Sequence, residues 1–302
     1  MGHPYLVQPM QIETLHKEFG ATVTGVDLSN LSEQQFADID QAINQYSFLL
    51  FPDQHLDDQS HIQFTSRFGE LEEEHVTYYS TGGISYIGVV GNVDLDGNKR
   101  DNQDRKTRAQ TGNQLWHSDS SFREIPSQYS LLYAYEVPDE GGETEFVSAR
   151  AAYARLDQET KTNIDSMVGI HDYIYSRTQV GEDAVNQGQR TFMHPVRQKL
   201  VRTNPVTGEK NYYVGSHVRD IDGMESDDAR PLIQSLIDEA TRPESIYRHT
   251  WKSGDFVIWD NRCMLHRGCG YDADKYRRRM HQTRVRCRST SLAEDMYANI
   301  VS

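Results

Sequence analysis

The sequence predicts a mainly β protein with flanking helices, and two observations support this fold class. From residue 83 onward, short segments rich in aromatic and β-branched residues recur at close spacing, as strands do. Two helical segments interrupt them, at 148–167, with a break near Asp157, and at 225–242. Many strands with helices segregated between them are typical of a β-sandwich or barrel, not of a doubly wound sheet. The expected strands are SYIGVVGNV, YSLLYAYEV, GETEFVSA, KNYYVGS, ESIYRHTW, DFVIWDN and HQTRVRCR.

The first part of the chain has a mixed α/β pattern. Apolar residues at helical spacing predict two helices, each with a recognisable start or stop. A short apolar run ended by a proline reads as a buried strand. The predicted elements are a strand at 20–28, a helix at 32–47 that begins at Ser32, a strand at 48–53 and a helix at 57–69 that ends at Gly69.

Composition limits the classes of function. No repeat or linker divides the 302 residues, so we expect one domain, 1–302. A net charge of −14 argues against nucleic acid as the partner, and no apolar run is long enough for a membrane span. The three cysteines form no CxxC pair, which disfavours a disulfide framework and favours a reducing, cytoplasmic compartment. The basic stretch NKRDNQDRKTR reads as a solvated loop.

The stretch QLWHSDSSF contains a candidate pair of metal ligands. His117 and Asp119 are two residues apart, so on a strand both point to the same side. His266 follows the apolar strand DFVIWD and is the best third ligand. Two imidazoles and one carboxylate suit non-haem Fe(II) and leave three coordination positions open. The alternatives are a polar pair on a sheet surface and a zinc site with Cys263 and Cys269.

Several ordered blocks make the chain resemble a known family. QLWHSDSSF, VPDEGGETEF, ARAAYARL and YRHTWKSGDFVIWDNRCMLHRGCGYD resemble the Fe(II)/2-oxoglutarate dioxygenases of the taurine dioxygenase superfamily, and most of all its 2,4-dichlorophenoxyacetate dioxygenase branch. The resemblance covers nearly the whole chain. It implies a double-stranded β-helix, or jelly roll, with His117, Asp119 and His266 as the iron ligands.

The resemblance also implies a site for the cosubstrate. In the family, a threonine and an arginine hold the distal carboxylate of 2-oxoglutarate, and a guanidinium suits this task because it donates two parallel hydrogen bonds. The threonine here is Thr144, in GGET. For the arginine, ungapped counting from His266 favours Arg277, whereas the motif R-x-M-H favours Arg278. Arg278 is our choice and Arg277 the alternative.

The substrate contacts are less clearly marked. In relatives, an arginine four residues beyond the cosubstrate arginine grips the substrate, but here that position is Gln282, or His281 if Arg277 is the anchor. Glutamine can donate a hydrogen bond but cannot pair a charge. Lys99 could supply the missing positive charge. The candidate substrate contacts are His75, Tyr78, Asn92, His217 and Gln282.

The predicted activity is therefore that of an Fe(II)/2-oxoglutarate dioxygenase that uses O2 and releases succinate and CO2. It would hydroxylate a C–H bond of a small anionic molecule resembling an aryloxyalkanoate, a sulfonate or an amino acid, and ether or C–N cleavage could follow. The alternatives are a desaturation in natural-product biosynthesis and a cupin-like binding protein without turnover. The family resemblance also suggests a homo-oligomer.

Overall fold

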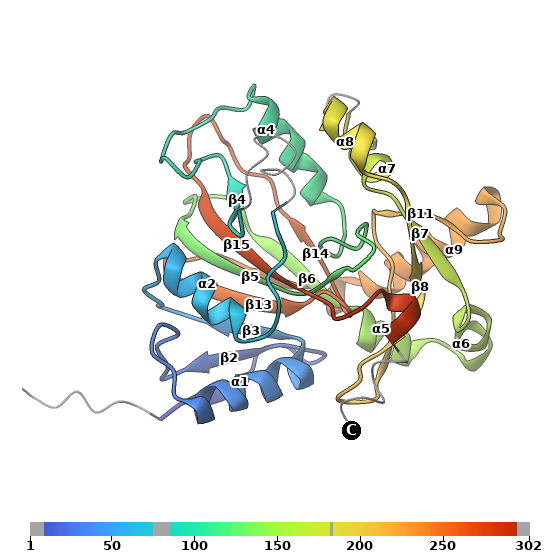
Figure 1. Ribbon diagram of the computed structural model, residues 1–302, viewed down its shortest axis with the longest axis horizontal. Coiled ribbons are helices and arrows are strands. Elements are labelled where there is room, and N and C mark those ends of the chain that lie inside the picture. Colours follow the sequence, from blue (N-terminus) through green and yellow to red (C-terminus); the bar gives the residue numbers. More distant parts are fainter. Residues whose placement is uncertain (1–8, 75–84, 182–183, 295–302) are drawn as a thin grey trace, which may run out of the picture.

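The structure, a computed structural model, describes residues 9–74, 85–181 and 184–294, and two facing sheets form its centre (Figure 1). The larger sheet has seven strands in the order β1-β2-β3-β13-β5-β15-β4, and the smaller has three in the order β12-β6-β14. The bounds of the larger sheet are β1 Gln11–Thr14, β2 Ala21–Thr24, β3 Phe48–Phe51, β13 Phe256–Asp260, β5 Ser127–Glu136, β15 Arg279–Arg286 and β4 Gly88–Gly91. Those of the smaller are β12 Tyr247–His249, β6 Thr144–Ser148 and β14 Met264–Gly268.

The central strands are apolar on both faces, because each face is covered. Along β13, Phe256 and Ile258 face the N-terminal helices, while Val257 and Trp259 face the smaller sheet. Trp259 packs edge-on against Phe146 of β6, with ring centroids 5.6 Å apart. This doubly covered layer explains the near-continuous apolar run of DFVIWD. The space between the two sheets holds the pocket described below.

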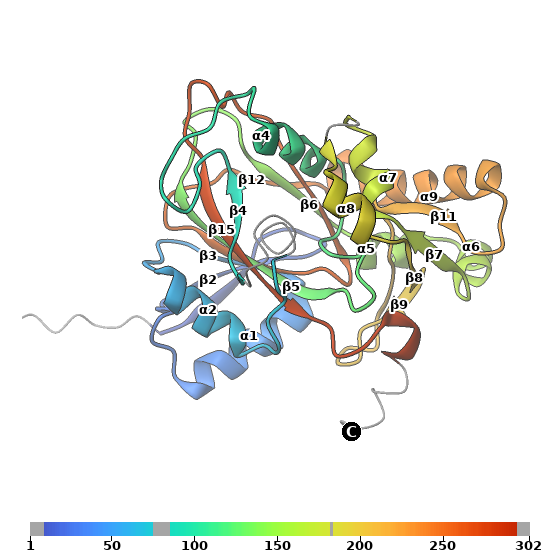
Figure 2. The same cartoon turned by 45° about the horizontal axis from the view of Figure 1, so that its top comes forward.

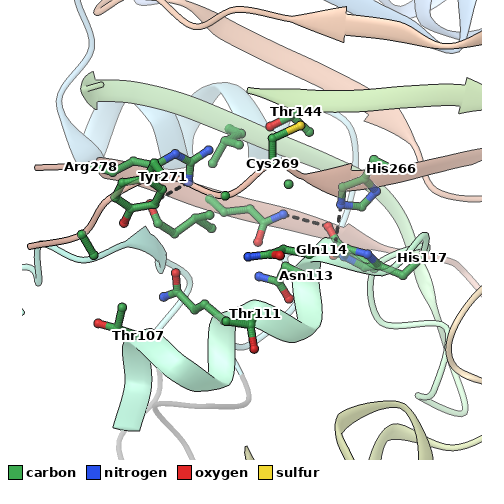
Figure 3. Close-up of a pocket in the computed structure, with 18 of the residues that line it drawn as sticks. Thr107, Thr111, Asn113, Gln114, His117, Thr144, His266, Cys269, Tyr271 and Arg278 are labelled. Atoms are coloured by element: carbon green, nitrogen blue, oxygen red, sulfur yellow. Dashed lines mark hydrogen bonds and ion pairs between the residues drawn. The ribbon is translucent and has the colours of Figure 1, made fainter. Parts of the chain in front are cut away.

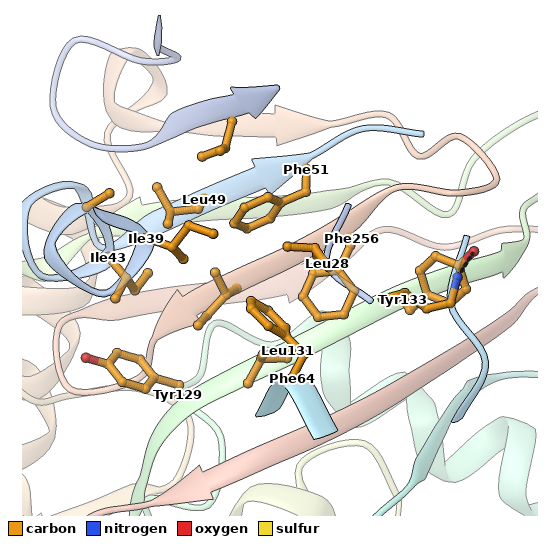
Figure 4. Close-up of a cluster of buried hydrophobic side chains, with 14 of the residues drawn as sticks. Leu28, Ile39, Ile43, Leu49, Phe51, Phe64, Tyr129, Leu131, Tyr133 and Phe256 are labelled. Atoms are coloured by element: carbon orange, nitrogen blue, oxygen red, sulfur yellow. Dashed lines mark hydrogen bonds between the residues drawn. The ribbon is translucent and has the colours of Figure 1, made fainter. Parts of the chain in front are cut away.

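Helices α1 (Glu33–Tyr46) and α2 (Asp58–Ser66) cover the outer face of the larger sheet. Figure 4 shows Ile39 and Ile43 of α1 and Phe64 of α2 packed against Leu131 and Phe256. The predicted start of α1 is confirmed, since Ser32 caps it in a capping box with Gln35. The predicted stop at Gly69 is wrong by a few residues, because α2 ends at Ser66 and two turn residues follow before the glycine.

The predicted break near Asp157 is confirmed. Asp157 accepts the amide of Thr160 and so begins α6 (Gln158–Ile164) after α5 (Ala149–Arg155). Helix α9 (Ser226–Ala240) lies within the predicted range 225–242. These helices pack on a second apolar cluster beside a three-stranded sheet, β11-β7-β8, and a strand pair, β10-β9. Their bounds are β7 Val168–His171, β8 Val196–Lys199, β9 Val201–Thr203, β10 Lys210–Tyr212 and β11 Val218–Ile221.

Short helices complete the fold: α4 (Arg105–Ala109), the 3-10 turn η1 (Gln110–Gln114), α7 (Tyr173–Thr178) and α8 (Gln187–Phe192). Figure 2 shows α4 beside the open end of the two sheets, with α7 and α8 next to it. Two further 3-10 turns are η3 (Pro243–Ser245) and η4 (Ser291–Ala293). Within the described ranges, no helix combines the length and apolarity needed to cross a bilayer. The prediction of a mainly β fold with flanking helices is confirmed.

Two buried histidines outside the pocket predict that the fold loses stability in acid. Burial lowers the pKa of His61 and of His171 to about 3, from 6.5. Below pH 6.5 the unfolded chain therefore binds protons that the folded chain does not. The free energy of unfolding should then fall by up to about 1.4 kcal/mol per pH unit for each histidine, until the pH approaches 3. Urea unfolding at pH 7.5, 6.5 and 5.5 measures this slope.

His171 is the histidine to replace, because neither ring nitrogen has a hydrogen-bond partner among the described residues. His171→Phe should make the free energy of unfolding less dependent on pH below 6.5. His55→Phe is the matched control, because the His55 side chain is 86% exposed. An unchanged slope in His171→Phe would contradict this origin of the acid sensitivity.

Candidate active site

A pair of backbone hydrogen bonds brings two of the predicted ligands together. His117 and His266 form an isolated antiparallel bridge, in which each N–H donates to the other residue's carbonyl, at 3.0 and 2.9 Å. The segment around His117 thereby extends the smaller sheet beside β14. The two imidazole rings lie with their centroids 4.2 Å apart. Residues distant in sequence thus become neighbours through ordinary sheet pairing.

Asp119 completes a compact group with these histidines. Its Oδ1 lies 3.6 Å from Nε2 of His117 and 3.7 Å from Nε2 of His266. One ligand atom from each of the three residues lies within 4.8 Å of the others, and this is the sole group of its kind among the described residues. It contains neither Cys263 nor Cys269, so the structure does not favour the zinc alternative.

The protonation of all three groups suits a metal ion. Nδ1 of His117 lies 2.7 Å from the carbonyl oxygen of Leu115, to which only a protonated nitrogen can donate, so the neutral tautomer that fits this contact has its lone pair on Nε2. Burial and the neighbouring His117 lower the pKa of His266 to about 3, which keeps this ring neutral. Although burial opposes ionisation of Asp119, the two histidines hold its pKa well below the usual value.

Hydrogen bonds fix the other carboxylate oxygen of Asp119. Oδ2 accepts hydrogen bonds from Ser130 Oγ at 2.7 Å and from Gln282 Nε2 at 2.8 Å. The carbonyl oxygen of the same glutamine accepts from Arg284 Nη1 at 2.8 Å, and Arg284 pairs with the buried Glu72. The carboxylate is therefore fixed with Oδ1 toward the histidines. Gln282 lines the pocket, but its amide nitrogen already donates to Oδ2 of Asp119.

A cavity of about 210 Å³ adjoins this group (Figure 3). His117, Asp119 and His266 lie at one end and Arg278 at the other, and Thr144 lines the cavity between them. The opposite wall comes from the stretch between β4 and His117, including α4 and η1. We call these residues the amide wall, because their side chains are uncharged amides and hydroxyls: Asn102, Thr107, Gln110, Thr111, Asn113 and Gln114.

Arg278 has the environment expected of an anion-binding residue. Its side chain is buried, and Nε has no hydrogen-bond partner among the described residues. The terminal nitrogens make only long contacts, to the carbonyls of Val90 at 3.5 Å and Gly142 at 3.4 Å. Burial lowers its pKa to about 10, so the guanidinium still carries its charge at neutral pH. Arg277 lies outside the pocket, where its guanidinium pairs with Glu136 at 2.6 Å.

Thr144 is oriented by a residue that the sequence did not suggest. Its Oγ1 accepts the indole N–H of Trp251 at 2.9 Å. Because an indole nitrogen can only donate, the threonine's own hydroxyl hydrogen remains available to a carboxylate. The glycines before Thr144 are required by the turn: Gly141 has a φ of +75°, and a Cβ there would lie 2.5 Å from the carbonyl oxygen of Gly270.

The structure brings few of the other predicted substrate contacts to the pocket. Asn92 is fully buried behind it, where its Oδ1 accepts the backbone N–H of Arg278 and its Nδ2 donates to backbone carbonyls, which favours a structural role over the predicted contact with substrate. His217 packs edge-on against His117 with ring centroids 5.9 Å apart and does not line the cavity. Lys99 donates to the carbonyl of Asp274 outside it. His75 and Tyr78 lie outside the described residues.

The amide wall is the part of the site that sequence reasoning missed. The stretch NKRDNQDRKTR, predicted to be a solvated loop, contributes Asn102 and Thr107 to the cavity and contains most of α4. That prediction is therefore wrong for its second half. The available signal was the spacing of Thr107, Gln110, Thr111 and Gln114, which lie on one face of a helix that leads directly to His117.

Two sheets that enclose two imidazoles, one carboxylate and a buried arginine define a class of protein, the non-haem Fe(II) oxygenases. The model of the family described as "Taurine catabolism dioxygenase TauD, TfdA family" matches residues 11–284, and the chain belongs to this family. The jelly roll predicted from the resemblance is thereby confirmed, as is the use of Fe(II), 2-oxoglutarate and O2 by a dioxygenase.

Individual relatives agree with this membership. The chain is 36% identical to the alpha-ketoglutarate-dependent 2,4-dichlorophenoxyacetate dioxygenase of Burkholderia sp. (strain RASC), over 91% of this chain and 95% of that one. It is also 36% identical to the (S)-phenoxypropionate/alpha-ketoglutarate-dioxygenase of Sphingobium herbicidovorans, over 89% and 93%. The crystal structure of AAD-2 in complex with Mn(II) and N-oxalylglycine superposes with a TM-score of 0.85 at 36% identity, covering 94% and 99%.

Proposed function

We propose that His117, Asp119 and His266 hold the iron of this dioxygenase, and that Arg278 and Thr144 hold the distal carboxylate of 2-oxoglutarate. The observation that carries the proposal is that one cavity contains both groups, with neutral imidazoles at one end and a buried guanidinium without a carboxylate partner among the described residues at the other. An unpaired buried charge is costly, so an anionic ligand is the natural partner for Arg278.

The chain's residues then act mainly by position. Ferrous iron, when bound, would supply the activation of O2, one oxygen atom of which enters succinate as 2-oxoglutarate loses CO2 while the other enters the substrate C–H bond. Leu115 fixes the His117 ring, Ser130 and Gln282 fix the carboxylate, and Trp251 orients Thr144. Leu132 and Trp259 supply apolar lining that limits water in the cavity. No side chain needs to act as a general acid or base.

The substrate proposal rests on the relatives. Their names give 2,4-dichlorophenoxyacetate and (S)-phenoxypropionate as substrates. We therefore propose a small organic substrate with a polar end, of the aryloxyalkanoate, sulfonate or amino-acid type. Its oxidised C–H bond would lie beside the iron and opposite the amide wall. If that carbon bears an ether oxygen or an amine nitrogen, the hydroxylated product would collapse with cleavage of the bond.

The proposed function is tested by anaerobic titration of the protein with Fe(II) and 2-oxoglutarate. A weak visible charge-transfer band is expected, which arises when the keto acid chelates bound iron. A panel of phenoxyacetates, phenoxypropionates, sulfonates and N-substituted amino acids, read by succinate formation and by mass spectrometry of the product, then identifies the substrate. A folded protein that gives no band would contradict the proposed site.

Gln282 gives a prediction about the metal itself. Gln282→Leu removes the donor to Asp119 Oδ2 and leaves Arg284 without its partner at this position, so Fe(II) should bind about 10- to 100-fold more weakly. Equilibrium titration with Fe(II), or with Co(II) as a spectroscopic stand-in, measures this change without turnover. The exposed Gln158→Leu is the matched control. Equal affinities in the two variants would show that Gln282 has no role in holding the carboxylate.

The remaining proposals concern the molecule as a whole. We propose that residues 1–302 act as one domain, since the family match extends over most of the chain. Cys263, Cys269 and Cys287 are free thiols, which supports a reducing, cytoplasmic location. A homo-oligomer is proposed from the family resemblance, and sedimentation velocity would measure it.

A further inference from the structure

The charges around the cavity are already balanced before any substrate enters. Among the described side chains that line it, Asp119 and Arg278 are the two with a permanent charge. With iron and 2-oxoglutarate bound as proposed, the two positive charges of the metal and one of Arg278 match one negative charge of Asp119 and two of the cosubstrate. A substrate carboxylate placed here would thus be an uncompensated charge in a partly buried cavity, which is unfavourable.

Among the described side chains, no lysine or arginine other than Arg278 lines the cavity. The segments 1–8, 75–84, 182–183 and 295–302 contain neither lysine nor arginine. Two nearby arginines do not line it: Arg177 donates to the uncharged amide of Asn113, and Arg284 pairs with Glu72. Gln282, which faces the cavity from β15, is held between Asp119 and Arg284. Among the described side chains that line the cavity, the groups left for a substrate's polar end therefore carry no permanent charge.

Within the amide wall, Gln114 is the residue best placed to bind the polar end of a substrate. Gln110 is used by the backbone of β4, since it accepts from Gly91 and donates to Val89, and Asn113 accepts from Arg177. Gln114 makes no side-chain hydrogen bond within the described residues and is exposed to the cavity. It lies three residues before His117, and Figure 3 shows it next to Asn113, beside the His117 end of the cavity. Its amide can both donate and accept.

We propose that this enzyme recognises the polar end of its substrate through the uncharged amide of Gln114 and not through a paired cation. The inference rests on the proposed function and specifies its substrate class: a molecule whose polar end is bound by hydrogen bonds alone. An amide or another neutral group at that end should therefore bind at least as tightly as the corresponding carboxylate. Discrimination between substrates would then depend on the geometry of these hydrogen bonds and would change little with ionic strength.

The test uses the anaerobic complex of the full-length protein with Fe(II) and 2-oxoglutarate. Two matched pairs of probes, phenoxyacetate with phenoxyacetamide and 3-phenylpropanoate with 3-phenylpropanamide, are titrated while the charge-transfer band is followed. We expect each amide to bind at least as tightly as its acid. An acid that binds more than threefold tighter than its amide, or the failure of all four probes to perturb the band, overturns the inference.

A charge introduced at the same position makes the assignment of Gln114 testable. Gln114→Lys should shift the ratio of acid to amide affinity about tenfold toward the acid. Gln103→Lys adds the same charge at an exposed residue of the preceding loop and should leave the ratio unchanged. An unchanged ratio in Gln114→Lys rejects Gln114 as the recognition residue. Absence of the band before any probe is added would instead refute the proposed iron and cosubstrate site.

Discussion

Replacement of His117 by alanine is expected to abolish the Fe(II)- and O2-dependent release of succinate from 2-oxoglutarate. The variant loses one of three ligands from a group whose atoms lie within 4.8 Å of each other, and the remaining imidazole and carboxylate form an incomplete site. Succinate formation should fall to the level of the metal-free protein. The anaerobic charge-transfer band should disappear in the same variant, which separates loss of the iron complex from a defect in substrate binding.

The control for this prediction is His55→Ala, which removes an exposed imidazole far from the pocket in sequence. Thermal unfolding of both variants checks that they remain folded. The bridge between His117 and His266 is formed by backbone atoms, so it does not require the imidazole. A folded His117→Ala protein that still released succinate at the wild-type rate would show that the iron is bound elsewhere.

Arg278→Leu is expected to raise the apparent dissociation constant for 2-oxoglutarate by about 100-fold or more. The guanidinium is buried and charged, and removal of one partner from a buried charge pair commonly costs 2 to 5 kcal/mol, of which about 2.7 kcal/mol corresponds to 100-fold. Fe(II) affinity should be nearly unchanged, because Arg278 lies at the opposite end of the cavity from the ligands. Anaerobic titration with 2-oxoglutarate at saturating Fe(II) measures the effect.

The neighbouring arginine provides a matched control. Arg277→Leu removes the same group one residue earlier, but there the guanidinium pairs with Glu136 on the surface. Exposed ion pairs contribute little, so this variant should bind 2-oxoglutarate as the wild type does. If Arg277→Leu proved to be the variant with weakened binding, the ungapped alignment would be the correct one and our choice of Arg278 would be wrong.

The chain's local patterns predicted much of the fold, because capping residues and apolar spacing act over short distances. Ser32 and Asp157 begin helices as expected, and the apolar runs at Phe48 and Phe256 form buried strands. Strands β7 and β11, which pair in the separate three-stranded sheet β11-β7-β8, were not predicted. Their few residues are stabilised by pairing with distant partners, and such contacts leave no periodic signal in so short a segment.

The residues of the candidate site likewise divide into those that the sequence suggested and those that depend on contacts between distant segments. The proposed metal ligands could be chosen from the sequence because a family resemblance connected His266 to the H-x-D pair, and Arg278 because of the motif R-x-M-H and its place on the strand face of Met280 and Gln282. The role of Gln282 in fixing the Asp119 carboxylate could not be predicted, because this hydrogen bond joins residues 163 positions apart. The amide wall was missed because its polar residues have the composition of a surface loop, and only the contacts of η1 with β14 and β4 turn them inward.

Because the backbone itself pairs His117 with His266, we expect the fold to assemble before iron binds. The spacing of the two imidazoles is set by the same ladder geometry that joins any adjacent strands, so it exists in the newly folded polypeptide without a cation to organise it. Iron would then bind reversibly to a protein that has already folded. Small zinc domains differ, because their folding depends on the ion.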